Sequence, residues 1–119
     1  MFCGLLKATK GGTGNVSLVC QMSGLIYAVR CLKCAQCGYV GETGRTFESR
    51  TEDHERGVRL AYATPIGCHF NDGEHSRLDF RIQVVWLLQH NSQVNRKIIE
   101  SKFIARLGTL KPAGLNLHP

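Results

Sequence analysis

Cysteine spacing is the feature of this sequence that most restricts how it can fold. Six cysteines occur in 119 residues, and three of them fall in the segment Cys31-Leu-Lys-Cys34-Ala-Gln-Cys37. A two-residue spacing allows thiolates to converge on one metal ion, and Cys-x-x-Cys in an intracellular protein indicates metal or redox chemistry more often than disulfides. Further along, five residues separate His69 from His75, which is within the range of a histidine pair in a zinc site.

Other uses of the cysteines remain open from the residues alone. An even number of cysteines permits a disulfide framework, but residues 1–10 lack the basic stretch and long apolar core of a signal peptide. Free structural thiols are another alternative. Within a metal site, Cys37 and Cys68 could replace Cys31 or Cys34 as ligands. We expect an intracellular protein that is not secreted, with zinc bound by some of these residues.

Length and composition describe one basic globular domain. Hydrophobic residues make up 43% of the chain and charged residues 20%, which argues against disorder. No apolar run approaches the ~20 residues of a membrane span, so we expect no membrane partner. Fifteen Lys and Arg against nine Asp and Glu give a net charge of +6. That excess suits a polyanion such as nucleic acid, although a soluble domain with scattered charges would show it as well.

The hydrophobic pattern predicts a small α+β domain over residues 24–119, preceded by a flexible N-terminal segment over residues 1–23. Three segments are predicted to be strands: 25–29, 39–40 and 80–88. The middle strand is expected to close at Gly41 and Gly44. The first two strands are near enough in the chain to form an antiparallel hairpin with the cysteines at its tip.

Two helices complete the predicted fold, a three-stranded antiparallel sheet flanked by helices. Thr46 can cap a helix that Gly57 ends, and Ser92 can cap a final helix that runs to about Leu107. The expected apolar face of the final helix consists of Val94, Ile98, Ile99, Phe103 and Leu107. Residues 64–78 are expected to be a loop that carries the two histidines.

Six polar residues follow these elements in an order that resembles the GIY-YIG endonuclease family: Tyr27, Tyr39, Arg50, His54, Glu100 and Asn116. The two family signatures correspond to Leu25-Ile26-Tyr27 and Tyr39-Val40-Gly41. The similarity continues through Glu-Thr-Gly-Arg45, Arg50-x3-His54, Glu100-Ser-Lys-Phe-Ile and Gly114-Leu-Asn116, so it covers residues 24–116. The chain departs from the pattern at Leu25, where the family has glycine, and at Val40, where it has isoleucine.

The cysteines and histidines resemble those of one subfamily, the endonuclease domain of Penelope-like retroelements. Cys31 and Cys34 fall between the two tyrosine signatures, and His69 and His75 follow the first helix. In those elements the domain follows a reverse transcriptase and nicks DNA for target-primed insertion. The resemblance therefore implies DNA and a reverse transcriptase domain as partners, and a nuclear location. A chain of 119 residues has no room for the reverse transcriptase.

The resemblance also implies a role for each residue. Glu100 would hold one catalytic Mg²⁺ or Mn²⁺, Arg50 would hold the phosphate, and Tyr27 would accept the proton of the attacking water. Tyr39 and His54 would orient water or assist proton transfer, and the products would carry 5′-phosphate and 3′-hydroxyl groups.

The remaining implied roles concern the zinc site and the DNA backbone. Asn116 would complete the active site, and the zinc ion would be structural because four ligands leave no open position. Four basic residues are expected to contact DNA: Arg30, Lys33, Arg45 and Arg50.

Each of these residues has a plainer reading when it is taken alone, as a core aromatic, a solvated helix position or a turn residue. Two alternative functions also remain. One is a zinc-stabilised nucleic-acid-binding module without catalysis, and the other is a repair or structure-specific nuclease with the same fold.

Overall fold

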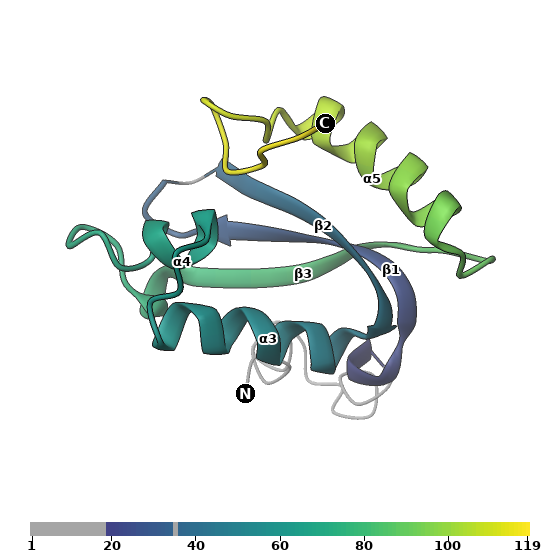
Figure 1. Ribbon diagram of the computed structural model, residues 1–119, viewed down its shortest axis with the longest axis horizontal. Coiled ribbons are helices and arrows are strands. Elements are labelled where there is room, and N and C mark those ends of the chain that lie inside the picture. Colours follow the sequence, from purple (N-terminus) through teal and green to yellow (C-terminus); the bar gives the residue numbers. More distant parts are fainter. Residues whose placement is uncertain (1–18, 35) are drawn as a thin grey trace.

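Three antiparallel strands form the centre of the molecule (Figure 1). The computed structural model describes residues 19–34 and 36–119, without the side chains of residues 36 and 37. Strand β1 spans Ser23–Cys31, β2 spans Gln36–Thr46 and β3 spans Phe80–Leu87, in the order β2-β1-β3. The predicted α+β class and the three-stranded antiparallel sheet are therefore confirmed. The first two strands form the expected hairpin, with Cys34 in the turn that follows Cys31.

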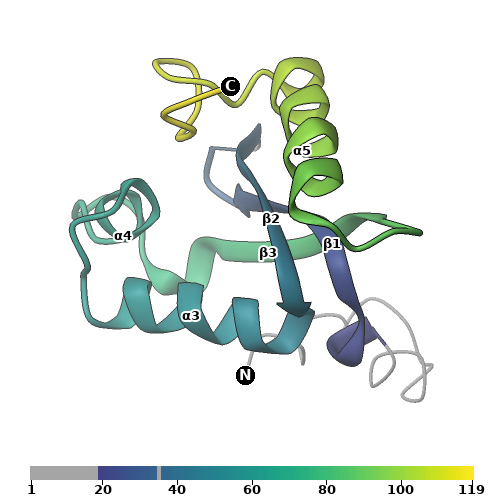
Figure 2. The same cartoon turned by 45° about the vertical axis from the view of Figure 1, so that its right-hand side comes forward.

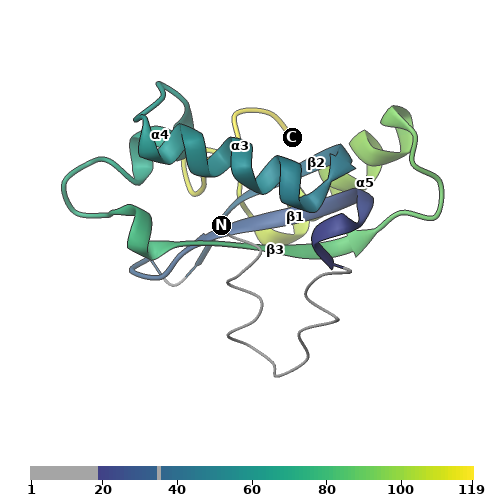
Figure 3. The same ribbon diagram turned by 90° about the horizontal axis from the view of Figure 1, so that it is seen from below.

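Helices lie on both faces of the sheet. Figure 2 shows α3 (Phe47–Arg59) below the sheet and α5 (Gln93–Leu107) above it, and Figure 3 shows α3 in front of the strands when the molecule is seen from below. A five-residue helix, α4 (Pro65–His69), and a 3₁₀ turn, η1 (Arg77–Asp79), connect α3 to β3. In the described part of the chain, none of the helices combines the length and the apolar character that crossing a bilayer would require.

The alternating side chains of β1 supply both halves of the core, because successive residues of a strand point to opposite faces. Leu25, Tyr27 and Val29 belong to the larger cluster, which packs against α3 and α4. Ile26 belongs to the smaller cluster, which packs against Ile104 of α5. All four of these β1 side chains are at most 1% exposed, so the strand is the buried spine of the domain.

Strand β2 is longer than the sequence pattern predicts, and it continues through both glycines that were expected to close it. Gly41 pairs with Tyr27, and a Cβ atom at this position would lie 2.3 Å from the Tyr27 hydroxyl oxygen. Glycine is therefore required here to admit a neighbouring phenol, and it does not end the strand. Gly44 is likewise close to Arg96, whose guanidinium would lie within 2.8 Å of an added Cβ.

The helices also differ in part from the predictions. Helix α3 begins after the Thr46 cap as expected but continues past Gly57 to Arg59. Helix α4 lies within the segment predicted to be a loop, because Thr64 caps it and Pro65 occupies its first turn. Sequence periodicity alone does not reveal a helix of five residues, since it completes little more than one turn.

The apolar face of α5 is rotated from the predicted one. Ile99, Phe103 and Ile104 pack toward the sheet, whereas Val94 is 69% exposed and Ile98 is 49% exposed. Leu107 is also exposed. The helix packs mainly on β2 at the edge of the sheet, so only a narrow stripe of its surface is covered.

Only the end of the predicted flexible segment, residues 1–23, can be compared with the structure, since residues 1–18 lie outside the described residues. Residues 19–23 belong to the packed domain. Cys20 is 8% exposed, and the Phe47 N–H donates to the Met22 carbonyl oxygen at 2.7 Å.

Candidate active site and metal centre

A hydrogen-bonded trio of side chains links β1 to α3. The Tyr27 hydroxyl oxygen lies 2.7 Å from His54 Nε2, and Arg50 Nε donates to the same oxygen at 3.0 Å. Because a guanidinium can only donate, this arrangement favours donation of the Tyr27 proton to a neutral His54 that is protonated at Nδ1. Arg50 and His54 therefore share one face of α3, as their four-residue spacing predicts.

Burial sets the protonation of this trio. It raises the pKa of Tyr27, with a smaller contribution from Tyr39. Burial also lowers the pKa of His54 to about 4, and the Arg50 charge adds to that shift. Near pH 7 the phenol and the imidazole are consequently both neutral, and no phenolate is available at Tyr27.

Two adjoining cavities open along the β2 edge of the sheet. The first has a volume of ≈ 350 Å³, and its lining includes Tyr39, Arg50 and His54. The second has a volume of ≈ 370 Å³ and is lined by Tyr39 and Glu100, among other residues. Tyr39 and Pro65 line both, so the two cavities adjoin at these residues. We refer to these two cavities together as the β2-edge depression.

The two tyrosines of the family signatures occupy different depths beside this depression. Their ring centroids are 6.4 Å apart, and the Tyr39 ring is 5.9 Å from that of His54. Tyr27 is 0% exposed, whereas Tyr39 is only partly buried and lines both cavities. Tyr39 is therefore the phenol that a bound molecule would contact, and Tyr27 lies beneath the surface.

Glu100 belongs to a charge network that the sequence indicates only in part. Its Oε1 atom lies 3.7 Å from Lys97 Nζ, which is also 3.2 Å from Oε2 of Glu42. Arg96 Nε donates to the other Glu42 oxygen at 2.6 Å. The pattern Arg96-Lys97 one turn before Glu100 was visible in the sequence, but only the fold brings Glu42 to it.

Glu100 is less fully neutralised than Glu42, because Glu42 contacts both Arg96 and Lys97 whereas Glu100 contacts Lys97 at 3.7 Å. An added cation would therefore stabilise the Glu100 carboxylate more than that of Glu42. Burial raises the pKa of Glu100, a shift that Lys97 opposes and Glu42 reinforces. The negative charge of Glu100 raises the pKa of both Tyr27 and Tyr39, and Glu100 and Tyr39 line the same cavity. A half-buried oxygen donor of this kind suits Mg²⁺ or Mn²⁺, whose remaining ligands are water and phosphate.

Asn116 is buried beside the same depression and is fully engaged with the backbone. Its Oδ1 atom accepts from the Val40 N–H at 2.9 Å, and its Nδ2 atom donates to the Val40 carbonyl oxygen at 2.9 Å. The side chain is part of a residue only 5% exposed. Asn116 therefore attaches the C-terminal segment to β2 and shapes the lining of the second cavity.

The basic residues expected to contact DNA fall into two groups. Arg45 forms an ion pair with Asp53, whose carboxylate also lies 3.8 Å from Arg50 Nη1. Arg30 and Lys33 are exposed beside the cysteines, and Lys33 Nζ donates to the Glu74 carbonyl oxygen at 2.6 Å. The structure thus brings Arg45 and Arg50 together and places Arg30 and Lys33 beside the Cys/His cluster.

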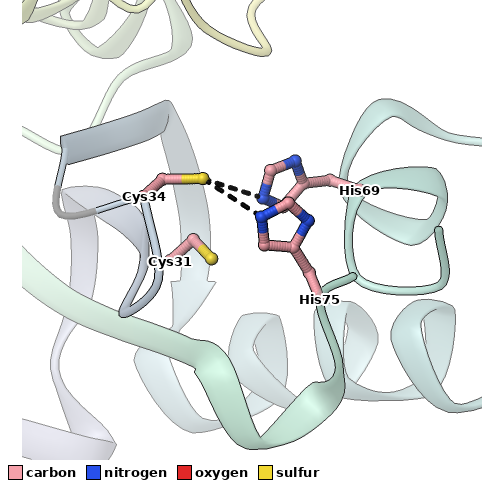
Figure 4. A group of neighbouring side chains, drawn as sticks. All are labelled: Cys31, Cys34, His69 and His75. Carbon is pink, nitrogen blue, oxygen red and sulfur yellow. Dashed lines mark hydrogen bonds between the residues drawn. The ribbon is translucent and has the colours of Figure 1, made fainter. Parts of the chain in front are cut away.

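Four potential metal ligands converge from separate elements: Cys31, Cys34, His69 and His75. Figure 4 shows both imidazoles directed toward the Cys34 sulfur, with Nε2 of His69 at 3.7 Å and Nε2 of His75 at 3.4 Å. All four ligand atoms lie within 4.8 Å of one another. Zinc bonds of about 2.0–2.3 Å in a tetrahedron require ligand separations of roughly 3.3–3.8 Å. This cluster could therefore hold a metal such as zinc after a small contraction.

Cys68 and Cys37 were the two alternative thiol ligands for the metal. Cys68 is an exposed free cysteine outside the four-residue cluster, although it precedes His69 directly. The Cys37 side chain lies outside the described residues. Cys31 and Cys34 are free cysteines, which excludes a disulfide between them in this structure.

Asp72 supports the cluster from outside, and sequence reasoning missed it. Its Oδ2 atom lies 2.8 Å from His75 Nδ1, while Oδ1 accepts the backbone N–H groups of Glu74 and His75, each at 2.9 Å. An Nδ1–H donor leaves Nε2 of His75 free to bind a metal, so the carboxylate fixes the tautomer and the ring orientation. An acidic residue three positions before a candidate ligand was the available signal.

Replacing Asp72 with asparagine is expected to weaken zinc binding by about 10- to 100-fold, because an amide can no longer hold the His75 ring as a charged acceptor. Competition with a chromophoric chelator measures the affinity. Glu74→Gln is the matched control, since only its backbone contacts Asp72 and Lys33. Equal zinc affinity in Asp72→Asn and the unmodified chain would show that Asp72 has no orienting role.

Comparison of the chain with protein-family models, curated proteins and solved structures gave no match. The candidate site combines a guanidinium, a neutral imidazole, a phenol and a half-buried carboxylate along one depression, with a Cys/His cluster at the hairpin turn.

Proposed function

We propose that this chain is a divalent-metal-dependent DNA endonuclease of the GIY-YIG type, similar to the endonuclease domain of Penelope-like retroelements. The observation that carries the proposal is the convergence of Tyr39, Arg50, His54 and Glu100 on the β2-edge depression. They come from β2, α3 and α5, so their meeting is not a consequence of neighbouring positions in the chain.

Arg50 is the proposed phosphate ligand. Its Nε atom donates a hydrogen bond to the Tyr27 hydroxyl oxygen, and this bond holds the planar guanidinium in place. The two Nη atoms of Arg50 would then bind a phosphate. Asp53 lies 3.8 Å from Nη1 and would have to share it with the substrate. This preorganised cation would stabilise the negative charge that develops as water attacks phosphorus.

The burial of Tyr27 favours roles for the two tyrosines that differ from the roles implied by the family resemblance. Tyr27 already uses its hydroxyl with His54 and Arg50 and has no exposed surface. We therefore propose that Tyr39 orients the attacking water or accepts its proton. Tyr27 is proposed to position Arg50 and His54. Water oxygen bonds to phosphorus as the bond to O3′ breaks, which yields 5′-phosphate and 3′-hydroxyl ends.

Glu100 is the proposed ligand of Mg²⁺ or Mn²⁺, which when bound would supply Lewis-acid stabilisation of charge on the phosphate. Within this chain, Glu42 reinforces the rise in the pKa of Glu100, so a bound cation would relieve the repulsion between the two carboxylates. Lys97 would have to release Glu100, to which it is bound at 3.7 Å.

The Cys/His cluster is proposed to bind structural Zn²⁺. Two cysteines and two histidines close a tetrahedral shell, and they join the β1–β2 turn to the segment after α3. In Penelope-like elements the partner is a reverse transcriptase, for which the 3′-hydroxyl product of nicking would be a primer.

A second function is favoured by one observation, the contact of Lys97 with both Glu42 and Glu100. A lysine that already neutralises the proposed metal ligand is compatible with a zinc-stabilised DNA-binding module that has lost catalysis. Incubation with supercoiled plasmid and Mg²⁺ or Mn²⁺ separates the two functions. The nuclease converts the plasmid to the open circular form, whereas the binding module retains DNA in a salt-dependent manner without cutting it.

The two tyrosines provide a test of the proposed roles. Tyr39→Phe is expected to lower the nicking rate by about 100-fold, as loss of a proton-transfer group does, with a small effect on thermal stability. Tyr27→Phe is expected to destabilise the fold by about 1–3 kcal/mol as well, because it leaves buried His54 and Arg50 atoms without their partner. Plasmid nicking and urea unfolding measure the two effects. Full activity of Tyr39→Phe would contradict the assignment.

A further inference from the structure

A small pocket between β3 and α5 lies away from the β2-edge depression. It has a volume of ≈ 210 Å³ and is lined by Trp86, Ile99, Lys102, Phe103 and Arg106. Because the sheet order is β2-β1-β3, β3 is the edge strand farthest from β2. Helix α5 therefore lies between two sites, with Glu100 lining one and Lys102 and Arg106 lining the other.

The chemistry of this pocket is aromatic and cationic. The rings of Trp86 and Phe103 have centroids 6.1 Å apart and planes inclined by 50°, and Trp86 is 51% exposed. Lys102 and Arg106 are the charged residues of the lining, and neither forms an ion pair with another described residue. An apolar floor beside two cations without counter-ions is suited to a planar ligand that carries negative charge on both sides.

We propose that this pocket binds an unpaired nucleobase of single-stranded nucleic acid. Trp86 and Phe103 would stack on the base, and Lys102 and Arg106 would contact the adjacent phosphates. The volume is below the roughly 300 Å³ at which pockets for drug-sized ligands begin, which fits one ring system rather than a complete nucleotide. The choice of nucleic acid as the occupant rests in part on the proposed function, whereas the geometry of the pocket does not.

Charge favours nucleic acid over an acidic peptide as the occupant. Strand β3 and helix α5 together contain five basic residues and a single acid, Glu100. Sequence-independent attraction to a phosphate backbone scales with such an excess, and stacking tolerates any base because every base has a π-face. The lining supplies aromatic rings that match the face of a base and cationic side chains that match phosphates.

The position suggests what the pocket does in a nicking reaction. The two sites lie on opposite flanks of α5, so they are separated by about the 10–12 Å diameter of a helix with its side chains. A strand that is cut on one flank could thus have a neighbouring unpaired base held on the other. The pocket would favour substrates whose strands are already separated over fully paired duplexes.

Trp86 makes the proposal directly measurable, because it is the only tryptophan of the chain. The full zinc-loaded chain is titrated with a dodecamer of deoxythymidine, with no other divalent cation present so that no cleavage occurs. We expect saturable quenching of tryptophan fluorescence, and weaker quenching by a duplex of the same length. Absence of quenching at oligonucleotide concentrations that saturate the anisotropy of a labelled dodecamer would overturn the proposal, as would quenching by an acidic peptide but not by DNA.

Variants identify the contacts. Lys102→Ala combined with Arg106→Ala is expected to lower the slope of log affinity against log salt by about 1.4, because two phosphate contacts to a single strand are lost. Lys111→Ala removes one charge outside the pocket and should leave the quenching unchanged. Trp86→Ala is expected to weaken the anisotropy-detected binding about 10-fold and Trp86→Phe much less, since a ring remains.

Equal quenching and an equal salt slope in the double variant, or equal binding by Trp86→Ala and the unmodified chain, would refute the assigned contacts. The readout is independent of cleavage. A chain that nicks plasmid without quenching disproves only the nucleobase pocket, and a chain that shows quenching but never nicks disproves only the nuclease.

Discussion

Glu100→Gln is expected to reduce nicking of supercoiled DNA by about 10³-fold or more, which would be the largest effect of any single substitution on activity. The proposed metal has one protein carboxylate, and loss of one preorganised electrostatic group alone costs about 10²- to 10³-fold. The amide keeps the size of the side chain but supplies no negative charge. Conversion of supercoiled to open circular plasmid, measured over a range of Mn²⁺ concentrations, gives the rate.

The fold should survive this substitution, because Glu100 is held in a partly buried site that raises its pKa. An amide at this position relieves the cost of a half-buried charge, and Lys97 keeps its contact with Glu42. Glu52→Gln, on the exposed surface of α3, is the matched control and should nick normally. Equal nicking by Glu100→Gln and the unmodified chain, or no nicking by the unmodified chain under any metal condition, would refute the proposed enzyme.

Cys34→Ser is expected to abolish zinc retention and to lower the melting temperature by about 10–20 °C. A ligand that binds only the folded chain stabilises it by about 2.7 kcal/mol when its concentration is 100-fold above the dissociation constant. For a domain of this size, 1 kcal/mol corresponds to about 4–8 °C. Cys34 is exposed, so replacing its sulfur costs little apart from the metal bond.

Cys68→Ser is a close control for this experiment, because it removes another exposed free cysteine beside His69 but outside the cluster. Elemental analysis of protein purified without added metal should find one zinc ion per chain in Cys68→Ser and close to none in Cys34→Ser. A Cys34→Ser protein that keeps a full equivalent of zinc and an unchanged melting temperature would show that the ligands are other residues.

These experiments probe two separate parts of the fold. The Cys/His cluster joins the β1–β2 turn to the segment after α3, while the proposed catalytic residues lie along the β2 edge. A small domain has a limited core, so a metal that fixes the β1–β2 turn to the connection between α3 and β3 can provide stability that helix and sheet packing do not. Loss of zinc should therefore reduce nicking through unfolding, with little effect below the melting temperature.

The order of the helices and strands was predictable because it depends on patterns within a few residues. The apolar runs 25–29 and 80–88 form strands, and Thr46 and Ser92 cap helices as expected. The pattern failed at Gly41, where glycine usually ends a strand. Here Gly41 continues the strand, because the Tyr27 phenol of the adjacent strand occupies the space that a Cβ atom would need.

The candidate site was predictable as a set of residues but not as a geometry. The spacing of Arg50 and His54 places both on one helical face, which local periodicity is sufficient to predict. The contact of Lys97 with Glu42 was not predictable, because 54 residues lie between them and only the packing of α5 on β2 brings them together.

The sequence by itself determined which residues are able to carry this chemistry: two phenols, a guanidinium, a carboxylate, and thiols and imidazoles at metal-binding spacing. Only the tertiary structure decided that Tyr27 lies beneath the surface while Tyr39 lines the depression, and that Cys68 lies outside the metal cluster. The physical reason is that residue type and local spacing are properties of short segments. Depth and direction, in contrast, are set by the register of β1 with β2 and by the packing of helices against that sheet.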